Sequence, residues 1–372
     1  MRIVADENIP LIENYFGGYD QLILKSGRSI VHSDLVDADI LLVRSVTRVN
    51  QALLKNTTVK FVGSATSGAD HLDTRWLEEN HIKWSAAQGC NATAVVEYVV
   101  CVIAALQKMS LLNHKKVRAA VVGVGRIGQQ VADKCTLLGF DVVLCDPLRP
   151  DITPTSFESL TDLDFITFHT PLTKTGDHPT YHLVQKEFLE RQKKNCILLN
   201  AGRGEVFAFD QLKKHGKQGA WCLDVWEGEP HIDVDVLEQA LIATPHIAGY
   251  SLQSKYRGTE MIYQAALKNN VLTHRSVSPL IYPTKKISVE SAKDWRDVVL
   301  SIFNPIAETV EMKRKLTEDP HCFEMLRKKF FDRYEFNFIE LENIKLPEAD
   351  RILLKQLGFG SVFIEASSRD AF

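Results

Sequence analysis

Short apolar runs separated by polar or helix-like segments recur along the first 85 residues of the chain. Short apolar strands that alternate with helical segments are typical of an α/β fold with a mostly parallel sheet. The expected strands in this part are residues 3–4, 40–43, 59–62 and 82–84.

A longer apolar stretch, residues 92–106, follows and is interrupted by Glu97. It is shorter than the ~20 residues that a membrane span requires, so we expect a buried helix that joins two α/β units. Six apolar runs then occur at residues 119–122, 142–145, 165–168, 197–200, 221–224 and 241–243. Six strands with segments of suitable length between them predict a second, doubly wound sheet.

The chain changes character near residue 280, where serine and proline punctuate the sequence after a predicted helix at residues 251–270. Such punctuation indicates a domain boundary. Beyond it, apolar runs at residues 287–289, 336–339 and 362–364 alternate with helical stretches near 294–312 and 320–331. They predict a small α/β segment without an evident catalytic motif.

The composition argues against several classes of function. The 44 basic and 47 acidic residues leave a formal net charge of −3, without the basic excess that nucleic-acid binding needs. The N-terminal apolar run is broken by two acids and does not resemble a signal peptide, so we expect a cytoplasmic protein with no membrane or nucleic-acid partner. The seven cysteines and the histidines lack metal-ligand spacing, so no metal site is expected.

A glycine-rich segment, Gly123-Val124-Gly125-Arg126-Ile127-Gly128, follows one predicted strand and opens a helix-compatible segment. In that context the glycines allow a tight turn, close backbone approach and helix packing, with a pyrophosphate at the helix N-terminus. Asp146 ends the next predicted strand, near the ~20-residue interval at which an acid binds the ribose hydroxyls. Because a carboxylate repels a 2′-phosphate, we predict NAD as the cofactor, although Arg149 close behind favours NADP.

Three charged residues each come shortly after a predicted strand. We therefore expect them at the carboxyl ends of the strands, where open α/β sheets bind ligands. His246 is the candidate base, because its ordinary pKa suits proton transfer near neutrality. Glu229 would hold the far ring nitrogen, and Arg203 would bind a substrate carboxylate through two hydrogen bonds. Glu227 is the alternative to Glu229; we prefer Glu229 because it precedes Pro230, but spacing alone does not separate them.

The run from Gly123 to His246 resembles the D-isomer-specific 2-hydroxyacid dehydrogenases, whose Arg, Glu and His occupy the motifs given above. Residues 43–47, 61–73, 89–98 and 224–230, with the tail beyond 280, narrow the resemblance to members that act on a phosphorylated sugar acid. The resemblance implies two doubly wound α/β units and a small C-terminal α/β dimerisation domain. The expected domains are a flavodoxin-like substrate domain (1–90 and 256–280), a Rossmann NAD domain (91–255) and the dimerisation domain (281–372).

By the same resemblance, the expected reaction is NAD-dependent oxidation of 4-phospho-D-erythronate in pyridoxal 5′-phosphate biosynthesis, by a homodimer. The family pattern places Ser45, Thr66 and Tyr250 at the substrate, and Asp146, Thr170, Ala201, Asp224 and Gly249 at the cofactor. Arg44 is a candidate phosphate ligand, because a dianion needs a charge-assisted partner. Its alternative is a strand-end charge that faces water.

Other functions remain open at this stage. One is a dehydrogenase for 3-phosphoglycerate or for an unphosphorylated 2-hydroxy acid, and another is a non-catalytic NAD-sensing protein similar to transcriptional corepressors. His169 ends a strand near the same sheet edge, and we interpret it as a lining or structural residue. The aromatics of the tail, Phe330, Phe331, Phe336 and Phe338, form either a dimer contact or the tail's own core.

Overall fold

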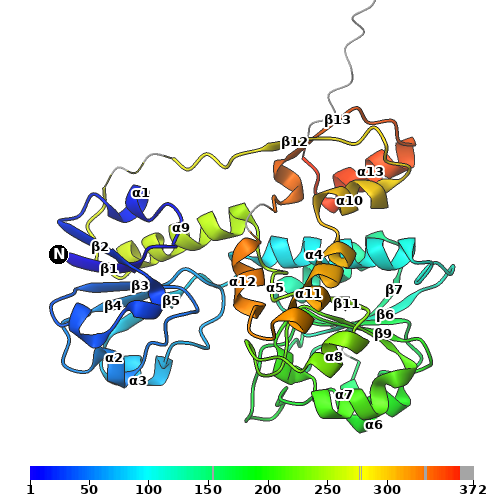
Figure 1. The fold of residues 1–372 in the computed structure, drawn as a ribbon, viewed down its shortest axis with the longest axis horizontal. Helices are drawn as coiled ribbons and strands as arrows, with labels where there is room; N and C mark the ends of the chain where they lie inside the picture. The colour runs from blue at the N-terminus through cyan, green and yellow to red at the C-terminus, as the bar shows by residue number, and fades with distance from the viewer. Residues whose placement is uncertain (153–154, 276, 278, 331–332, 361–372) are drawn as a thin grey trace, which may run out of the picture. The chain divides into compact units, whose positions relative to one another are not determined.

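The computed structural model describes residues 1–152, 155–275, 277, 279–330 and 333–360 (Figure 1). The chain divides into two compact units. The first unit comprises Met1–Ala92 and Ser251–Pro283, and the second unit comprises Thr93–Tyr250 and Thr284–Phe372. Each contains a sheet of parallel strands with helices on its faces, so the predicted α/β fold class is confirmed.

The first unit is built on a five-stranded parallel sheet in the order β2-β1-β3-β4-β5, the flavodoxin-like order. Its strands are β1 Arg2–Asp6, β2 Gln21–Lys25, β3 Ile40–Val43, β4 Phe61–Ser64 and β5 Lys83–Ala86. The sequence analysis missed β2, which lies at the sheet edge and is only partly buried along its length. A half-exposed edge strand shows a weaker apolar pattern than a central strand such as β3, which is buried throughout.

Helices cover both faces of this sheet (Figure 1). One face carries α1 Ile12–Phe16 and α9 Leu252–Lys268, which share a core with β1, β3 and β4. The other face carries α2 Gln51–Leu54 and α3 Thr74–Glu79. α9 starts at a capping box, in which the Ser251 and Ser254 hydroxyls each accept a hydrogen bond from the other's backbone N–H.

The second unit holds a six-stranded parallel sheet in the order β11-β10-β9-β8-β6-β7. The strands are β6 Arg118–Val122, β7 Asp141–Cys145, β8 Phe165–Phe168, β9 Ile197–Asn200, β10 Ala220–Leu223 and β11 Ile242–Ala243, which confirms the six predicted strands. Strand order reverses at β6, between β7 and β8. Open α/β sheets bind ligands at such a switch point, outside the carboxyl ends of the strands.

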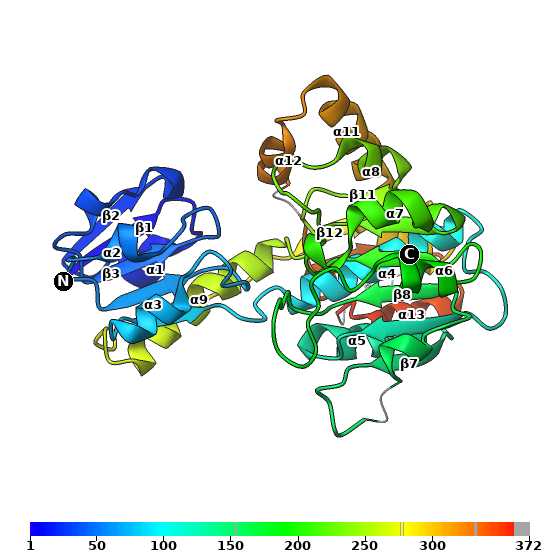
Figure 2. The same cartoon turned by 90° about the horizontal axis from the view of Figure 1, so that it is seen from below.

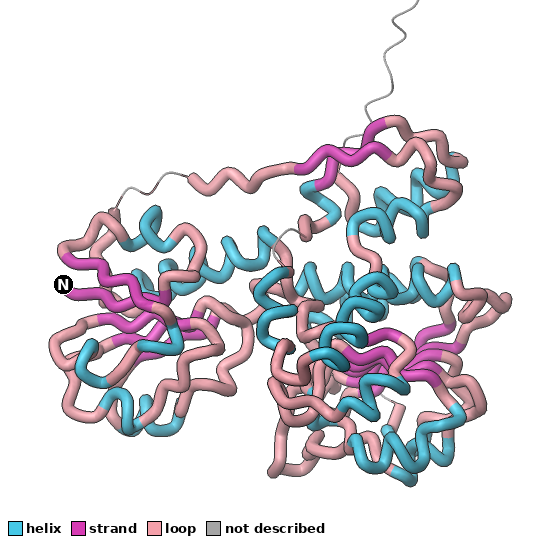
Figure 3. The backbone as a smooth tube through the Cα atoms, in the orientation of Figure 1, coloured by secondary structure: helices cyan, strands magenta, loops and turns pink. Residues whose placement is uncertain are grey.

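Helices again lie on both sides of the strands (Figure 3). One face is covered by α4 Ala92–Lys108 and α5 Arg126–Leu137, and the other by α6 Lys186–Arg191, α7 Phe209–His215 and α8 Val234–Gln239. α4 is the predicted apolar helix. Its buried Glu97 accepts a hydrogen bond from the backbone N–H of Phe336 at 2.8 Å, which explains an acid within an apolar stretch.

Residues 284–360 are called the appended segment below, and their described part (284–330 and 333–360) forms a two-stranded parallel sheet and four helices. Its elements are β12 Lys285–Ser288, α10 Trp295–Ile302, α11 Pro305–Glu318, α12 Phe323–Lys329, β13 Ile339–Glu342 and α13 Glu348–Leu357. The sequence analysis did not predict α13. The run predicted at 336–339 begins instead as a short 3₁₀ turn, Phe336–Phe338, before β13. The run at 362–364 and Phe331 lie outside the described residues.

Helix α11 of the appended segment packs against the edge strand β11 and lies beside α8 (Figure 2). The Thr309 hydroxyl accepts a hydrogen bond at 2.9 Å from the backbone N–H of Ala243 on the edge strand β11. Lys313 donates to the carbonyls of Glu238 and Ala240, both at 2.8 Å. α11 thereby satisfies one backbone N–H of the edge strand β11 and two carbonyls at the C-terminal end of α8.

The tail aromatics contribute to this packing. Phe336 is 1% exposed and stacks on Phe359 with ring centroids 4.4 Å apart, and Phe330 meets Phe303 edge-on at 5.5 Å. These contacts favour the interpretation of these rings as core residues. No helix among the described residues is long and apolar enough to cross a membrane, and all seven cysteines are buried free thiols.

Candidate active site

The glycine-rich loop follows β6 and leads into α5. Gly123 has φ +85°, and a Cβ there would lie 2.8 Å from the backbone of His169 and Thr170. A Cβ on Gly128 would lie 1.9 Å from the Gly123 carbonyl oxygen. A Cβ on Gly125, by contrast, would meet nothing within 4 Å. Gly123 and Gly128 therefore allow the loop to pack, while Gly125 leaves space for a ligand to approach the backbone.

Asp146 closes this loop from the end of β7. Its carboxylate accepts hydrogen bonds from the backbone N–H of Val124 at 2.8 Å and of Leu148 at 3.0 Å. Arg149 forms an ion pair with Asp151 at 2.6 Å and also donates to the Val124 carbonyl. The charge of Arg149 is thus already balanced by Asp151, which weakens the case for a 2′-phosphate beside it.

Two buried polar atoms lie beside the glycine-rich loop without a hydrogen-bond partner among the described residues. They are Oγ1 of Thr170 and Nδ1 of His169. The other ring nitrogen of His169 contacts Oγ1 of Thr167 at 2.9 Å, and burial lowers the pKa of His169 to about 4. Because buried polar groups normally have partners, these atoms fit a polar ligand such as NAD, with Gly125 leaving room for it.

His246 and Glu229 form a close pair. Oε2 of Glu229 lies 2.6 Å from Nδ1 of His246, and Oε1 accepts from the backbone N–H of Trp226 at 2.8 Å. Burial alone would raise the pKa of Glu229, but the charge and hydrogen bond of His246, the Trp226 N–H and the charge of Arg327 lower it overall. An ionised carboxylate can only accept, so Nδ1 of His246 is the donor.

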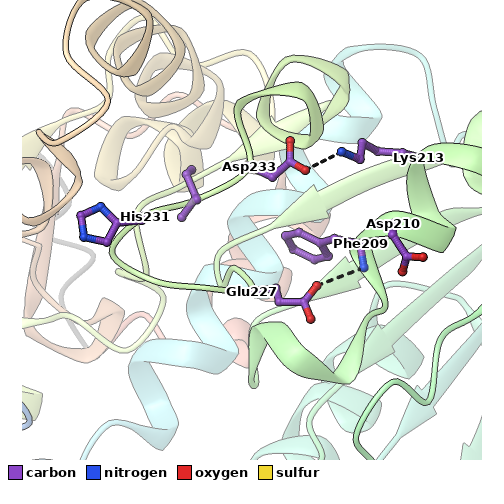
Figure 4. Close-up of a pocket in the computed structure, with 7 residues that line it drawn as sticks. Phe209, Asp210, Lys213, Glu227, His231 and Asp233 are labelled. Atoms are coloured by element: carbon purple, nitrogen blue, oxygen red, sulfur yellow. Dashed lines mark hydrogen bonds and ion pairs between the residues drawn. The ribbon is translucent and has the colours of Figure 1, made fainter.

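Glu227 has different partners. Its carboxylate lies 2.8 Å from Nε2 of His182 and accepts from the backbone N–H of Phe209 at 3.3 Å. It lines a cavity of about 440 Å³ together with Phe209, Asp210, Lys213, His231, Ile232 and Asp233 (Figure 4). The structure therefore brings Glu229, and not Glu227, to the ring of His246.

A buried carboxylate fixes the backbone around His246, which adopts a left-handed φ of +56°. The two oxygens of Asp224 accept from the Thr244 hydroxyl at 2.6 Å and from the N–H groups of Ile247 at 2.8 Å and Ala248 at 2.9 Å. Burial raises the pKa of Asp224 above its ordinary value, in spite of these donors. Asp224 thus anchors the loop of His246. The sequence analysis placed Asp224 at the cofactor and did not predict this network.

Arg203 lies half-buried after β9, in a loop closed by Asn200. The Asn200 amide donates to the Arg203 carbonyl at 2.9 Å, and its oxygen accepts from the N–H of Gly202 at 3.0 Å. Nη1 of Arg203 donates to the Gly202 carbonyl at 2.9 Å. The sequence analysis did not single out Asn200, whose side chain holds this loop by hydrogen bonds to backbone groups. Ala201 and Gly249 are half-buried after β9 and β11.

In the first unit, Arg44 follows β3 and pairs with the fully buried Asp6 at the end of β1. Its Nε and Nη2 donate to the two carboxylate oxygens of Asp6 at 2.9 and 3.3 Å. The Arg44 side chain remains 32% exposed, and the neighbouring Ser45 is exposed. The two-point contact gives the guanidinium a defined orientation, in contrast to a charge that only faces water.

Thr66 follows β4 and belongs to a short chain of hydrogen bonds. Its hydroxyl lies 2.9 Å from Oγ of Ser64, which lies 2.9 Å from Nε2 of His71. Burial lowers the pKa of His71 to about 4, so its ring is neutral near pH 7. The sequence analysis assigned no role to Ser64 or His71.

Tyr250 lies after the His246 loop, and its hydroxyl accepts a hydrogen bond from Nη2 of Arg327 on α12 at 3.1 Å. Arg327 was not among the candidate residues, because it lies far along the chain in a segment without a motif. In the part of the chain that the structure describes, no group of three or more His, Cys, Asp or Glu side chains is arranged to hold a metal ion.

Comparison with known proteins places these residues in a family. Residues 100–248 match the family model of the D-isomer specific 2-hydroxyacid dehydrogenase, NAD binding domain. Solved structures with a similar fold include D-lactate dehydrogenase from Aquifex aeolicus (TM-score 0.61, 22% identity, 73% of this chain and 96% of that chain). 3-Phosphoglycerate dehydrogenase from Entamoeba histolytica is also similar (TM-score 0.61, 19% identity, 76% of this chain and 99% of that chain).

Sequence relatives match more of the chain. Erythronate-4-phosphate dehydrogenase of Coxiella burnetii (strain RSA 331 / Henzerling II) is 43% identical over 364 residues, covering 96% of this chain and 98% of that protein. The protein of the same name from Marinobacter nauticus is 39% identical over 363 residues, covering 92% and 94%. The chain therefore belongs to the erythronate-4-phosphate dehydrogenase family, within the D-isomer-specific 2-hydroxyacid dehydrogenases.

Proposed function

We propose that this protein oxidises 4-phospho-D-erythronate to 2-oxo-3-hydroxy-4-phosphobutanoate with NAD, as a step of pyridoxal 5′-phosphate biosynthesis. The observation that carries the proposal is the 2.6 Å pair of His246 and Glu229 in the same unit as a glycine-rich loop that fits NAD. The family relationship over nearly the full chain supports the choice of substrate.

NAD, when bound, accepts the hydride that leaves C2 of the substrate. Nδ1 of His246 is held by Glu229, so Nε2 is the nitrogen that takes the proton of the C2 hydroxyl. The ionised carboxylate then stabilises the imidazolium that forms. The positive φ of His246 and the anchoring of its loop by Asp224 fix the direction of the ring.

Arg203 binds the substrate carboxylate and polarises the carbonyl that develops at C2. Arg44, oriented by Asp6, binds the phosphate, with Ser45, Thr66 and Tyr250 as further substrate contacts. The cofactor contacts are the loop residues Gly123, Gly125, Arg126, Ile127 and Gly128, with Asp146, Thr170, Ala201, Asp224 and Gly249. Both Asp224 oxygens are engaged by the His246 loop, so we assign its cofactor role to the loop that it shapes.

The test is the appearance of NADH absorbance when the purified protein receives NAD and 4-phosphoerythronate, compared with 3-phosphoglycerate at equal concentration. We expect far higher kcat/KM for 4-phosphoerythronate. The His246→Ala variant should lose most turnover, about 10²–10⁴-fold, while it still binds NADH by fluorescence. Comparable turnover of both acids would contradict the substrate assignment. Binding of NADH without turnover of any 2-hydroxy acid would favour an NAD-sensing protein.

We also propose that the protein is a homodimer through residues 281–372. The proposal rests on the family resemblance, in which the tail is a dimerisation domain. Three exposed apolar side chains lie on α11, α12 and α13 of the appended segment: Val310 (63%), Met325 (40%) and Ile352 (49%). Light scattering at micromolar concentration should give twice the chain mass of 42.0 kDa. A monomer mass would contradict the proposal. We further expect the protein to act in the cytoplasm, where its free thiols stay reduced.

A further inference from the structure

The appended segment sends one nearly buried guanidinium toward the candidate catalytic pair. Arg327 lies on α12, and its side chain is only 15% exposed. Nη1 forms an ion pair with Glu324 at 2.9 Å, and Nη2 donates to the Tyr250 hydroxyl at 3.1 Å. The guanidinium carbon lies 5.9 Å from the centroid of the Tyr250 ring. Nη2 therefore fixes the Tyr250 hydroxyl from a helix that carries no recognisable motif.

The charge of Arg327 also acts on Glu229. Burial alone would lower the pKa of Arg327, but Tyr250, Glu229 and Glu324 raise it overall, so the guanidinium stays charged. In return, Arg327 is one of the charges that keep Glu229 ionised. A buried charge is costly unless it is paired, and Glu324 supplies that pairing for Arg327 at 2.9 Å.

A second arginine of the appended segment supports the same relationship. Arg333 is 5% exposed, and its Nη2 donates to the Ala248 carbonyl at 3.1 Å and to the Ala94 carbonyl. Ala248 belongs to the loop that Asp224 anchors beside His246. The appended segment thus contacts the backbone near His246 at one point and the side chain of Tyr250 at another.

We propose that Arg327 is a positioning residue for the reaction, which orients the Tyr250 hydroxyl toward the substrate and adds positive charge beside the Glu229–His246 pair. The inference deepens the proposed function and rests on it for the role of Tyr250 as a substrate contact. It gives the appended segment a part in the chemistry of its own chain, separate from any part in dimerisation.

Two substitutions separate the two effects. Arg327→Gln removes the charge and the guanidinium that donates to both Glu324 and Tyr250. Arg327→Lys keeps the charge but replaces the planar donor with a point charge that cannot hold Glu324 and Tyr250 in the same way. We expect both variants to raise KM for 4-phosphoerythronate about tenfold or more, the usual effect of losing a hydrogen bond to a charged group. Tyr250→Phe should raise KM as well, and its effect should not add to that of Arg327→Lys, because both remove one contact.

Only Arg327→Gln should change the pH dependence. Without the cation, the pKa of Glu229 should rise, because Arg327 is one of the charges that lower it. The acid limb of kcat/KM should therefore move upward by about 0.5 pH unit. The same shift should appear in a carbon NMR titration of the Glu229 carboxyl without substrate. The carboxyl signal is assigned by its absence from Glu229→Gln.

The control is Arg314→Gln, an exposed arginine of α11 whose ion pairs among the described residues are with Glu311 and Glu318 of its own helix. It should leave KM, the acid limb and the Glu229 titration at wild-type values. The proposal is overturned if Arg327→Gln lowers the melting temperature but leaves KM and the Glu229 titration unchanged, or if Arg314→Gln reproduces its effects. Failure of the wild-type protein to turn over 4-phosphoerythronate would count against the proposed function instead, because the NMR titration needs no substrate.

Discussion

The pair of Glu229 and His246 offers the sharpest test of the catalytic arrangement, through the substitution Glu229→Gln. The side chain keeps its size and can still accept from the Trp226 N–H, which lies 2.8 Å from Oε1. What it loses is the negative charge beside Nδ1 of His246, at 2.6 Å. A separation this short is typical of a charge-assisted hydrogen bond.

The size of the effect follows from that contact. A hydrogen bond to a charged group contributes about 1.5–3 kcal/mol, which corresponds to a roughly 10- to 150-fold fall in kcat/KM. The loss grows toward ~10⁴-fold if the new amide donates to Nδ1, because Nε2 then carries the proton and cannot act as the base. The glutamine does not titrate, so the acid limb that protonation of Glu229 sets should move to lower pH.

The assay is NADH formation from 4-phosphoerythronate across pH 5 to 9, with NADH binding by fluorescence as a check that the cofactor site is intact. Glu227→Gln is the matched control, because Glu227 contacts His182 and the Phe209 N–H. We expect the control to keep wild-type rates and an unmoved acid limb. Wild-type rates in Glu229→Gln, or an equal loss in Glu227→Gln, would refute the assignment of Glu229 as the partner of the base.

Three further predictions address the cofactor loop, the phosphate ligand and the pH dependence of stability. Gly128→Ala places a Cβ 1.9 Å from the Gly123 oxygen. It should lower the free energy of unfolding by about 1–3 kcal/mol in urea titrations and weaken NADH binding. Unchanged values would contradict the close packing. Asp6→Asn should raise KM for 4-phosphoerythronate but not for an unphosphorylated 2-hydroxy acid, because Arg44 loses its orienting charge; an equal rise for both would argue against Arg44 as a phosphate ligand. Burial lowers the pKa of His169 from 6.5 to about 4, so between these values the unfolded chain binds a proton that the folded chain does not. The free energy of unfolding should therefore fall as pH drops from 6.5 to 4, at up to about 1.4 kcal/mol per pH unit, and His169→Gln should show a shallower slope; equal slopes would contradict this.

The sequence by itself determined the elements whose signal is local. The six apolar runs of the second unit became β6 to β11. The four central strands β6, β8, β9 and β10 are buried on both faces and need continuous apolar runs. The glycine-rich segment was equally readable, since tight turns and close backbone contacts exclude side chains at fixed positions along the chain. The same apolar runs predicted that Arg203, Glu229 and His246 each follow a strand.

Tertiary structure decided what depends on contacts between distant residues. It placed β2 at an exposed sheet edge, where burial no longer imposes a clear apolar pattern. It also separated Glu229 from Glu227, two residues with the same chemistry and nearly the same position, because only the path of the backbone sets which carboxylate reaches His246.

The roles of the residues that support the site could not be predicted from the sequence, because they too depend on contacts between distant residues. Asp6 orients Arg44 from another strand, and Asp224 anchors the His246 loop from within the core. Arg327 reaches Tyr250 from 77 positions further along the chain. A charged side chain acquires such a role only when folding removes it from water and places it beside a partner, and spacing along the sequence does not encode that proximity.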